Sequence, residues 1–432
     1  MPRRIVIVCS GTRGDVQPHV ALGARLHQGG AQVSIATHLN FRKLVEARGL
    51  SFAPLADNPN ELLVHPAYHG ALTPSAGLLR SAWATLRFWR AARAAFACMV
   101  HDAWQACQTA DTIVAALPTW WAAFIAEALR LPFVFASLQP LAPTADFPSP
   151  MLPLAPAAGP TFNRLTYALV EQLVWLPWRA ILNRWRSREL GLPALRRARV
   201  WRDWAGRPWP CVYGFSAVVV PRPLDWPPNH HISGYWFDAS TSTGQLSTDL
   251  ARFLEIGDPP IYIGFGSYPW RLAPVRLHTL IQALALAGLR AVVLVDDHTR
   301  QTLRWPASIY PLTYAPHDAL FPRVSLVVHH GGAGTVAAAL RAGAPQLIAP
   351  IAVDQFFWGA RVEALGVGRS LRRGPFASPV DADSLARVLQ EMTCHQELRR
   401  RAAHIQRTVL AEDGVGRAVE WIQAGETARI RR

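Results

Sequence analysis

The residues best suited to chemistry lie between 329 and 355, which read HHGGAGTVAAALRAGAPQLIAPIAVDQ. The apolar run 325–329 predicts a buried strand, and it ends at Gly331 and Gly332, where a backbone without Cβ atoms can turn tightly beside a ligand. A helix pattern follows over 335–341, and the free amides and dipole at its start attract an anion. The pattern therefore predicts a phosphate-binding turn, although the glycines alone fit a ligand-free connection equally well.

Polar side chains around this turn favour a bound ligand. His330 offers a ring N–H and Thr335 a hydroxyl, and both groups suit phosphate oxygens. Asp354 and Gln355 follow the next predicted strand, and their carboxylate and amide suit the hydroxyls of a polyol. His329 and His330 alternate along a strand and would point to opposite faces, so a shared metal site is not expected.

These segments resemble a known family. The motif HHGGAGT…AGAP…P…DQ resembles the donor-binding signature of the nucleotide-sugar (UDP-) glycosyltransferases with the GT-B fold, in the branch of sterol glucosyltransferases and of antibiotic and rhamnolipid glycosyltransferases. The opening RIVIVCSGTRGDVQPHVALGARL and the later ATHLNFRKLVEARGLSFAPL resemble the other half of that fold, so the resemblance covers nearly the whole chain. It implies an α/β protein with two Rossmann-like α/β/α domains, whose parallel sheets face a central cleft.

The resemblance also implies a function. It implies an inverting, metal-independent glycosyltransferase that moves a hexose, glucose from UDP-glucose in the first instance, to a hydroxyl of an apolar acceptor such as a sterol, lipid or polyketide. A UDP- or dTDP-hexose would be the co-substrate, with no other cofactor. By position, the implied donor contacts are Gly266, Ser267, His330, Gly332, Gly334 and Thr335 for the diphosphate, Tyr314, Ala315 (through its backbone) and His317 for the base, and Asp354 and Gln355 for the sugar.

Asp15 is the residue expected to remove the proton from the acceptor hydroxyl. It lies in the turn GTRGD, at the position where relatives with a GHVxP-type turn have a catalytic histidine. The residues alone leave an alternative, because Asp15 comes three residues before Pro18, which suits the first turn of a helix. A capping role would stabilise the carboxylate and weaken it as a base. His19 is the second candidate base.

Two features depart from the family pattern or point elsewhere. Ala338 stands where plant relatives have a glutamate for the ribose diol, so neither that contact nor the choice between UDP and dTDP is carried over. Asp381 and Asp383 form a D-x-D sequence, which resembles the metal motif of a different glycosyltransferase fold. They lie where a helix is predicted to start, and capping explains them better than a metal. No metal site is therefore predicted.

Charge and tryptophan content bear on the partners. The net charge is +15, but only Lys43 among 44 basic residues is a lysine, and without a nucleic-acid-binding motif no nucleic-acid partner is predicted. Residues 162–209 interleave tryptophan with arginine, which fits an anionic membrane surface and equally a solvated helix with packed tryptophans. Acceptor-lining candidates are Trp83, Trp89 and Trp120, with an ordinary core-facing helix as the alternative for the first two.

The order of elements predicts the domains. Strand and helix patterns alternate, which predicts parallel sheets covered on both faces, and the proline-rich stretch PRPLDWPPNHHISGYWFD separates two such series. We predict an acceptor-binding domain at 1–220, a linker at 221–245 and a nucleotide-sugar-binding domain at 246–410. In the resembled fold, the last helix, at 411–432, returns to the first domain.

The remaining composition predicts a cytoplasmic protein, with peripheral binding to the inner face of the membrane as a further option. No apolar run is long enough to span a bilayer, and the first predicted strand is too short for a signal-peptide core. Five cysteines without a C-x-x-C pair fit thiols in a reducing compartment. Two other functions stay open, a nucleotide-sugar epimerase of the same fold and a non-catalytic membrane lipid- or partner-binding protein; Asp15, Asp354 and Gln355 argue against the latter.

Overall fold

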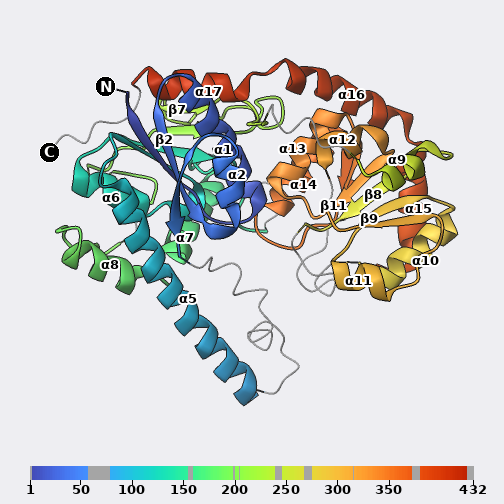
Figure 1. Cartoon of the computed structure of the whole chain (residues 1–432), viewed down its shortest axis with the longest axis horizontal. Helices are drawn as coiled ribbons and strands as arrows, with labels where there is room; N and C mark the ends of the chain where they lie inside the picture. The colour runs from blue at the N-terminus through green and yellow to red at the C-terminus, as the bar shows by residue number, and fades with distance from the viewer. Residues whose placement is uncertain are drawn as a thin grey trace.

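The computed structural model describes residues 2–56, 78–153, 159–197, 200–203, 205–238, 246–266, 275–314, 316–371 and 380–425. Two parallel sheets lie side by side in Figure 1, and helices cover both faces of each. The predicted α/β architecture with two Rossmann-like domains is confirmed.

The sheet of the N-terminal domain has the order β3-β2-β1-β4-β5-β6-β7, with every pair of neighbours parallel. Its central strands are buried along their length, as expected where helices cover both faces. The strand order reverses between β1 and β4, and a ligand crevice forms at such a point beyond the carboxyl ends of the strands. The strands are β1 (Arg4–Val8), β2 (Gln32–His38), β3 (Ser51–Leu55), β4 (Thr112–Ala115), β5 (Phe133–Ser137), β6 (Cys211–Tyr213) and β7 (His230–Ile232).

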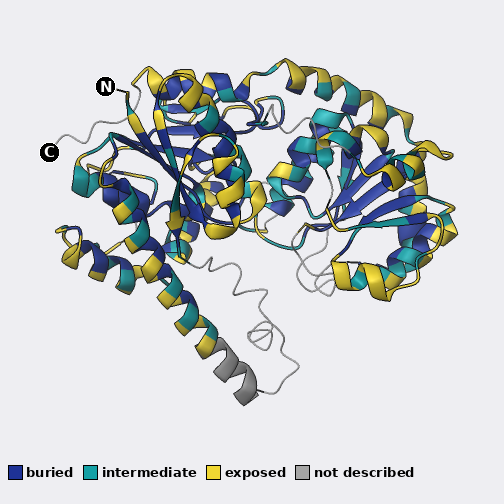
Figure 2. Ribbon diagram, viewed as in Figure 1, coloured by how far each residue is buried: buried dark blue, intermediate teal, exposed yellow. Residues whose placement is uncertain are grey.

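Alternate side chains of β1 pack into two different cores. Ile5 and Ile7 pack with α1 on one face, and Val6 and Val8 pack with α5 and α6 on the other. Figure 2 shows the buried strands between helices whose outer sides are exposed. The helices of this domain are α1 (Arg13–Gln28), α2 (Arg42–Glu46), α5 (Leu78–Cys107), α6 (Ala122–Leu129), α7 (Pro160–Trp175) and α8 (Arg179–Arg188).

The sheet of the C-terminal domain has the order β10-β9-β8-β11-β12-β13 and is also parallel. Its order reverses between β8 and β11, which places a second crevice after those strands. The strands are β8 (Ile261–Gly264), β9 (Ala291–Leu294), β10 (Ile309–Leu312), β11 (Leu326–His329), β12 (Gln346–Ile348) and β13 (Gly368–Ser370). The helices are α9 (Thr248–Glu255), α10 (Leu277–Ala287), α11 (Asp297–Thr302), α12 (His317–Leu320), α13 (Ala333–Ala342), α14 (Gln355–Leu365) and α15 (Ala382–Cys394).

The last two helices connect the domains. The helix α16 (Gln396–Ala411) packs on α13, and α17 (Gly414–Gln423) packs on α1, along the top of both domains in Figure 1. Ala418 and Ile422 of α17 are buried in the same core as Ile5 and Ile7. The chain therefore crosses back to the N-terminal domain before it ends.

Two elements differ from the sequence expectations. The predicted linker 221–245 contains β7, which pairs with β6 at the edge of the first sheet, so this part of the stretch belongs to the N-terminal domain. The helix α1 begins at Arg13, so Pro18 lies inside the helix and not in its first turn. Pro18 has no N–H to donate, and the carbonyl of Gly14 therefore loses its bond within the helix.

The tryptophans between 162 and 209 are mostly internal. Trp175, Trp185 and Trp209 are buried in the core of the N-terminal domain, which confirms the packed-tryptophan alternative for these three. Trp204 lies outside the described residues. No helix in the described ranges combines the length and the hydropathy needed to cross a membrane.

Candidate active site

The glycine turn after β11 is shaped by a buried histidine. Nδ1 of His329 accepts the backbone N–H of Gly331 at 3.1 Å, so Nε2 carries the proton that it donates to Oε1 of Gln346 at 3.0 Å. Burial lowers the pKa of His329 to about 3 and keeps its ring neutral. Both ring nitrogens of His329 are therefore used in hydrogen bonds that stabilise the turn.

The ring of His330 lies where two glycine turns meet. A Cβ on Gly266 would lie 3.0 Å from Cε1 of His330, and a Cβ on Gly332 would lie 2.7 Å from its Nε2. The parallel neighbours β8 and β11 bring both turns to this place. Burial lowers the pKa of His330 to about 4, so a neutral ring faces any phosphate here. Ser267, predicted in the second turn, lies outside the described residues.

Two helix N-termini face each other across the cleft. Gly334 lies in the first turn of α13, and a Cβ on it would come within 3.8 Å of Cα of Gly14 in the first turn of α1. Gly332 is the N-cap of α13 and has no side chain to cap the helix. The amides of Thr335 and Val336 donate to the carbonyl oxygen of Gly332, so the amides of Ala333 and Gly334 are the ones left for an anion. Both helix dipoles direct their positive ends toward this contact, so negative charge is favoured near it.

Asp15 lies in the first turn of α1, three residues after the N-cap Thr12. The backbone N–H and the hydroxyl of Thr12 both donate to Oδ2 of Asp15, at 2.8 and 2.9 Å, so Asp15 has part of the capping role that the sequence left open. Gly11 has a φ of +126°, and a Cβ there would lie 2.5 Å from Oδ2, so only glycine fits beside the carboxylate. Among the described residues, all protein hydrogen bonds to this carboxylate go to Oδ2, which leaves Oδ1 for a substrate hydroxyl.

Burial raises the pKa of Asp15, and the two bonds from Thr12 act in the opposite direction. A carboxylate with a raised pKa is a stronger base than a free aspartate. The capping contact therefore does not remove the capacity of Asp15 to accept a proton.

His19, one turn further along α1, is held on both sides of its ring. Nδ1 lies 2.6 Å from the carbonyl oxygen of Asp15, and Nε2 lies 2.9 Å from the carbonyl oxygen of Ala136. The ring is buried, and Trp236 packs edge-on against it with the ring centroids 5.6 Å apart. Burial also lowers its pKa. These contacts do not suit the second candidate base; they fix α1 to β5.

Asp354 is contacted from the opposite domain. Nε2 of Gln139 donates to Oδ2 of Asp354 at 3.2 Å, and Nε1 of Trp358 donates to the same oxygen at 3.0 Å. Burial raises the pKa of Asp354 to about 6, and the charge of Asp15 contributes to the rise. The two carboxylates therefore lie on opposite walls of one cleft.

Gln139 is a site residue that sequence reasoning missed. It follows β5 at the carboxyl edge of the sheet, where ligands bind in parallel sheets, and this position was the available signal.

The turn before Asp354 has a strained backbone, and a side chain stabilises it by hydrogen bonds. Val353 has a φ of 53°, a left-handed conformation that β-branched residues rarely adopt. Oε1 of the buried Gln355 accepts the backbone N–H groups of Ile351 and Ala352 at 2.7 and 3.0 Å. The carbonyl end of Gln355 thus holds the turn, and its amide nitrogen is the group left for a sugar hydroxyl.

The residues predicted around the nucleotide base have different surroundings. Tyr314 is exposed, and the guanidinium carbon of Arg13 lies 5.2 Å from its ring centroid. The ring of His317 stacks on Phe321 with the centroids 4.3 Å apart, and burial lowers its pKa to about 4. Ala315 lies outside the described residues. A planar base placed here would meet a tyrosine from one domain and an arginine from the other.

The tryptophans predicted to line the acceptor site have different surroundings. Trp120 is buried, and its ring packs edge-on against Trp175 with the centroids 6.1 Å apart, which are the contacts of a core residue. Trp89 is exposed on α5, with its ring 6.1 Å from that of Trp178. The side chain of Trp83 lies outside the described part of the chain.

The D-x-D sequence belongs to a helix start. Oδ1 of Asp381 accepts the backbone N–H of Ser384 at 2.8 Å and caps α15, which confirms the capping interpretation. In the part of the chain that the structure describes, no group of three or more His, Cys, Asp or Glu side chains is arranged to hold a metal ion.

Two Rossmann-like domains with opposed helix N-termini and a carboxylate on each wall define the class of GT-B nucleotide-sugar transferases. Comparisons with known proteins agree. Residues 5–147 match the glycosyltransferase family 28 N-terminal domain, and residues 279–419 match the erythromycin biosynthesis protein CIII-like C-terminal domain. The chain therefore belongs to the GT-B glycosyltransferases, and the resemblance seen in the sequence is confirmed.

The sequence relatives include sterol glucosyltransferases. The chain is 33% identical to a sterol 3-beta-glucosyltransferase of Emericella nidulans, over 98% of this chain and 30% of that protein. It is 34% identical to a sterol 3-beta-glucosyltransferase of Arabidopsis thaliana, over 97% of this chain and 65% of that protein. The chain thus spans less than two thirds of the length of these relatives.

Solved structures share the fold across both domains. The glycotransferase of kitacinnamycin superposes with a TM-score of 0.69 at 18% identity, over 99% of this chain and 100% of that one. The spinosyn rhamnosyltransferase complexed with thymidine diphosphate gives a TM-score of 0.60 at 18% identity, over 98% and 100%.

Proposed function

We propose that this chain is an inverting hexosyltransferase that moves glucose from UDP-glucose to the hydroxyl of a sterol or a similar apolar lipid. The observation that carries the proposal is the pair Asp15 and Asp354 on opposite walls of the gap where the N-termini of α1 and α13 meet. The activity of the sterol glucosyltransferase relatives supports the acceptor class. The thymidine diphosphate in one structural neighbour supports a nucleoside diphosphate as the leaving group, with UDP or dTDP as its form.

The C-terminal wall would bind the donor. Its diphosphate oxygens would accept the open amides at the start of α13 and the side-chain donors of Thr335 and His330. Negative charge grows on the diphosphate as its bond to the anomeric carbon breaks, and such preorganised donors stabilise that charge. In this proposal the diphosphate also contacts the glycine turn after β8, at Gly266 and Ser267, and the amides of Gly332 and Gly334. The nucleotide base contacts Tyr314, Ala315 and His317. The sugar contacts Asp354 and Gln355.

The N-terminal wall would activate the acceptor. Oδ1 of Asp15 takes the proton from the acceptor hydroxyl while the hydroxyl oxygen attacks the anomeric carbon from the face opposite the diphosphate. One C–O bond forms as the other breaks, so the configuration inverts. The hydroxyl becomes acidic once its new bond is largely formed, and a carboxylate with a modestly raised pKa is then a sufficient base.

His19 would act through Asp15. Its ring lies between the carbonyl oxygens of Asp15 and Ala136 and, when neutral, donates its one N–H to one of them, which fixes the ring between α1 and β5. We assign it a positioning role in place of the predicted catalytic one.

The acceptor class also bears on location. Sterols and similar lipids partition into bilayers, so we place the protein in the cytoplasm with peripheral binding to an anionic membrane surface.

The decisive experiment is product identification. Purified protein is incubated with lipid extracts and a panel of UDP- and dTDP-hexoses, and the products are identified by mass spectrometry. The proposal expects a lipid or sterol that has gained one hexose, together with free nucleoside diphosphate. A new sugar that remains attached to its nucleotide would instead identify an epimerase.

A further inference from the structure

The helix α7 carries an apolar face that points away from the protein. Five large apolar side chains on it or directly after its end are between 41% and 61% exposed, and they are Phe162, Leu165, Leu169, Leu173 and, after the end, Leu176. Their spacing of three or four residues places them within an arc of roughly 80° on a helix of 3.6 residues per turn. We call these five residues the leucine stripe. Amphipathic helices of soluble proteins normally bury such a stripe, so its exposure requires an explanation.

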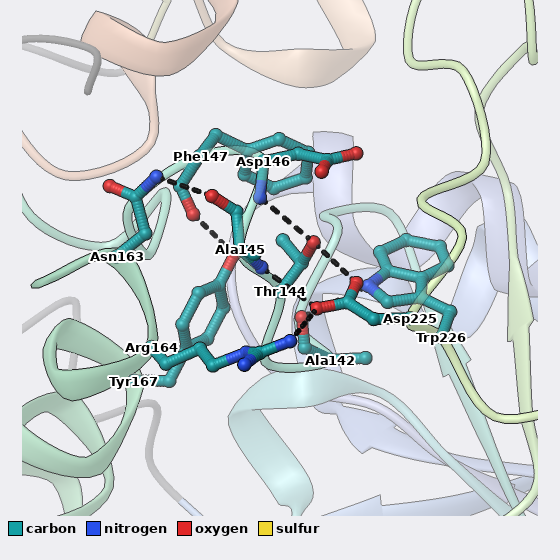
Figure 3. Close-up of polar contacts among 10 residues, drawn as sticks. All are labelled: Ala142, Thr144, Ala145, Asp146, Phe147, Asn163, Arg164, Tyr167, Asp225 and Trp226. Atoms are coloured by element: carbon teal, nitrogen blue, oxygen red, sulfur yellow. Dashed lines mark hydrogen bonds and ion pairs between the residues drawn. The ribbon is translucent and has the colours of Figure 1, made fainter. Parts of the chain in front are cut away.

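The rest of α7 is fixed by polar contacts, so the helix cannot turn its stripe inward. Nδ2 of Asn163 donates to the carbonyl oxygen of Ala145 at 2.7 Å. The hydroxyl of Tyr167 donates to the carbonyl oxygen of Phe147 at 3.3 Å. Arg164 forms an ion pair with Asp225, with Nη2 and Oδ2 at 2.9 Å (Figure 3). The stripe therefore faces outward because the opposite side of α7 is bonded to the domain.

The surface around the stripe is strongly basic. Six arginines of α5 and α8 are exposed, namely Arg87, Arg90, Arg93, Arg179, Arg184 and Arg188. Two others do not add to this charge, because Arg164 pairs with Asp225 and Arg186 is buried against Glu127. The helices α5, α7 and α8 are close together, because Trp178, between α7 and α8, stacks on Phe96 of α5 with the ring centroids 4.2 Å apart. Arg179, Arg184 and Arg188 of α8 are exposed beyond the end of the stripe. An apolar strip beside cationic side chains complements an anionic lipid surface.

We propose that the leucine stripe of α7 docks on an anionic lipid bilayer, with its side chains among the acyl chains and the arginines of α8 against the headgroups. This inference rests on the proposed function only for the lipid nature of the acceptor. A second copy of the chain fits the stripe less well, because the same arginine-rich surfaces would then face each other.

Docking there would place the bilayer next to a loop that reaches the candidate active site. The loop after β5 begins near Gln139, which contacts Asp354, and continues to Ala145 and Phe147, which hold α7. Phe147 also lies 5.2 Å, between ring centroids, from Phe357 of α14. A lipid acceptor that leaves the bilayer at α7 would thus enter between the two walls, beside the loop that contacts Asp354 and Phe357.

The test is flotation of the whole protein with vesicles of phosphatidylcholine alone and of phosphatidylcholine mixed with phosphatidylglycerol. We expect the protein to bind the mixed vesicles, and the triple variant Leu165→Gln, Leu169→Gln, Leu173→Gln to bind them at least about tenfold more weakly. The matched control carries Leu286→Gln, Leu303→Gln and Leu410→Gln in the C-terminal domain, at leucines that are 43% to 57% exposed, and it should bind like the original protein.

Several outcomes would overturn the inference. They are absence of binding by the original protein, equal binding by the α7 triple variant and the control, or a dimer in light scattering that the α7 variant dissociates. The proposed function is measured separately, with a sterol dispersed in detergent. There the α7 variant should transfer glucose at the original rate, whereas its transfer to sterol in mixed vesicles should fall about tenfold. Vesicle binding without transfer to any acceptor would contradict the proposed function and would still support docking through the leucine stripe.

Discussion

The two walls of the cleft use the same unit, a strand, a turn and a helix N-terminus, but fill it with different groups. On the C-terminal wall the turn is bare, and Gly332 caps α13 without a side chain. On the N-terminal wall the N-cap of α1 is Thr12, and the carboxylate of Asp15 in the first turn accepts its backbone N–H. One helix start is left open for an anion, and the other already holds one.

This difference explains how one fold supports two tasks. Both helix dipoles favour negative charge, so an open terminus suits a diphosphate and an occupied one keeps a carboxylate in place. Because Gly334 and Gly14 approach closely, the two tasks act on neighbouring atoms. In the proposed function, the residues in the first helical turn, and not the topology, separate donor binding from proton removal.

The largest effect is expected from filling the gap between the helix termini. Gly334→Leu would put a side chain where the diphosphate is expected, and donor affinity measured by calorimetry should fall about 100-fold or more. Gly334→Ala is the matched control, because its Cβ would lie 3.8 Å from Cα of Gly14, an ordinary contact, and affinity should change little. Equal losses of donor affinity in both variants would mean that the backbone conformation at residue 334, and not the space beside it, determines donor affinity.

Lowering the pH should weaken donor binding. The pKa of Asp354 is about 6, and only its ionised form accepts two sugar hydroxyls, so KM for the donor should rise as the pH falls through 6. Between pH 7 and pH 5 the expected rise is about tenfold, measured at saturating acceptor. A donor KM that stays flat over this range would remove Asp354 from sugar binding.

Gln139 of the N-terminal wall contacts Asp354 of the C-terminal wall, so replacing it should shift the pH dependence of the donor KM. Its N–H donates to Asp354 and lowers the pKa of that carboxyl, so Gln139→Leu should raise the midpoint of the KM profile by about half a unit to one unit. Gln139→Glu tests the same contact with a charge, which should raise the midpoint further. An unchanged midpoint in both variants would show that Gln139 does not affect the pKa of Asp354 in the protein without donor.

The smallest effect is expected at the base end of the cleft. Arg13 lies over the exposed ring of Tyr314, and exposed cation–π contacts contribute about 0.5–1 kcal/mol. Arg13→Gln should therefore raise the donor KM by about two- to fivefold. Arg25→Gln, on the last turn of the same helix, is a control that should leave KM unchanged.

The C-terminal wall could be read from the sequence because its chemistry is local. An apolar run, two glycines and a helix pattern define the turn within the seventeen residues 325–341, and the structure has the strand, the turn and the helix at the predicted places. The contact of Gln139 with Asp354 spans 215 positions, and no local pattern encodes it. The ring of His19 was ambiguous for the same reason, since one of its partners is the carbonyl oxygen of Ala136 on another strand.

Other elements were hidden by composition. The strand β7 is only three residues long and lies in a proline-rich stretch, so the sequence predicts a linker there. Tryptophan among arginines looks the same whether it packs inward or meets a membrane. The structure separates the two cases, because the tryptophans Trp175 and Trp185 are buried and the leucine stripe is what faces outward.

The division of labour between the walls is tested most directly by calorimetry and turnover on two isosteric variants, Asp15→Asn and Asp354→Asn. Asp15→Asn should bind UDP-glucose as tightly as the original protein and lose about 10²- to 10⁴-fold in transfer rate, as expected for the loss of a general base. Asp354→Asn should lose donor affinity. Weakened donor binding with surviving transfer in Asp15→Asn would contradict the assignment of proton removal to the N-terminal wall.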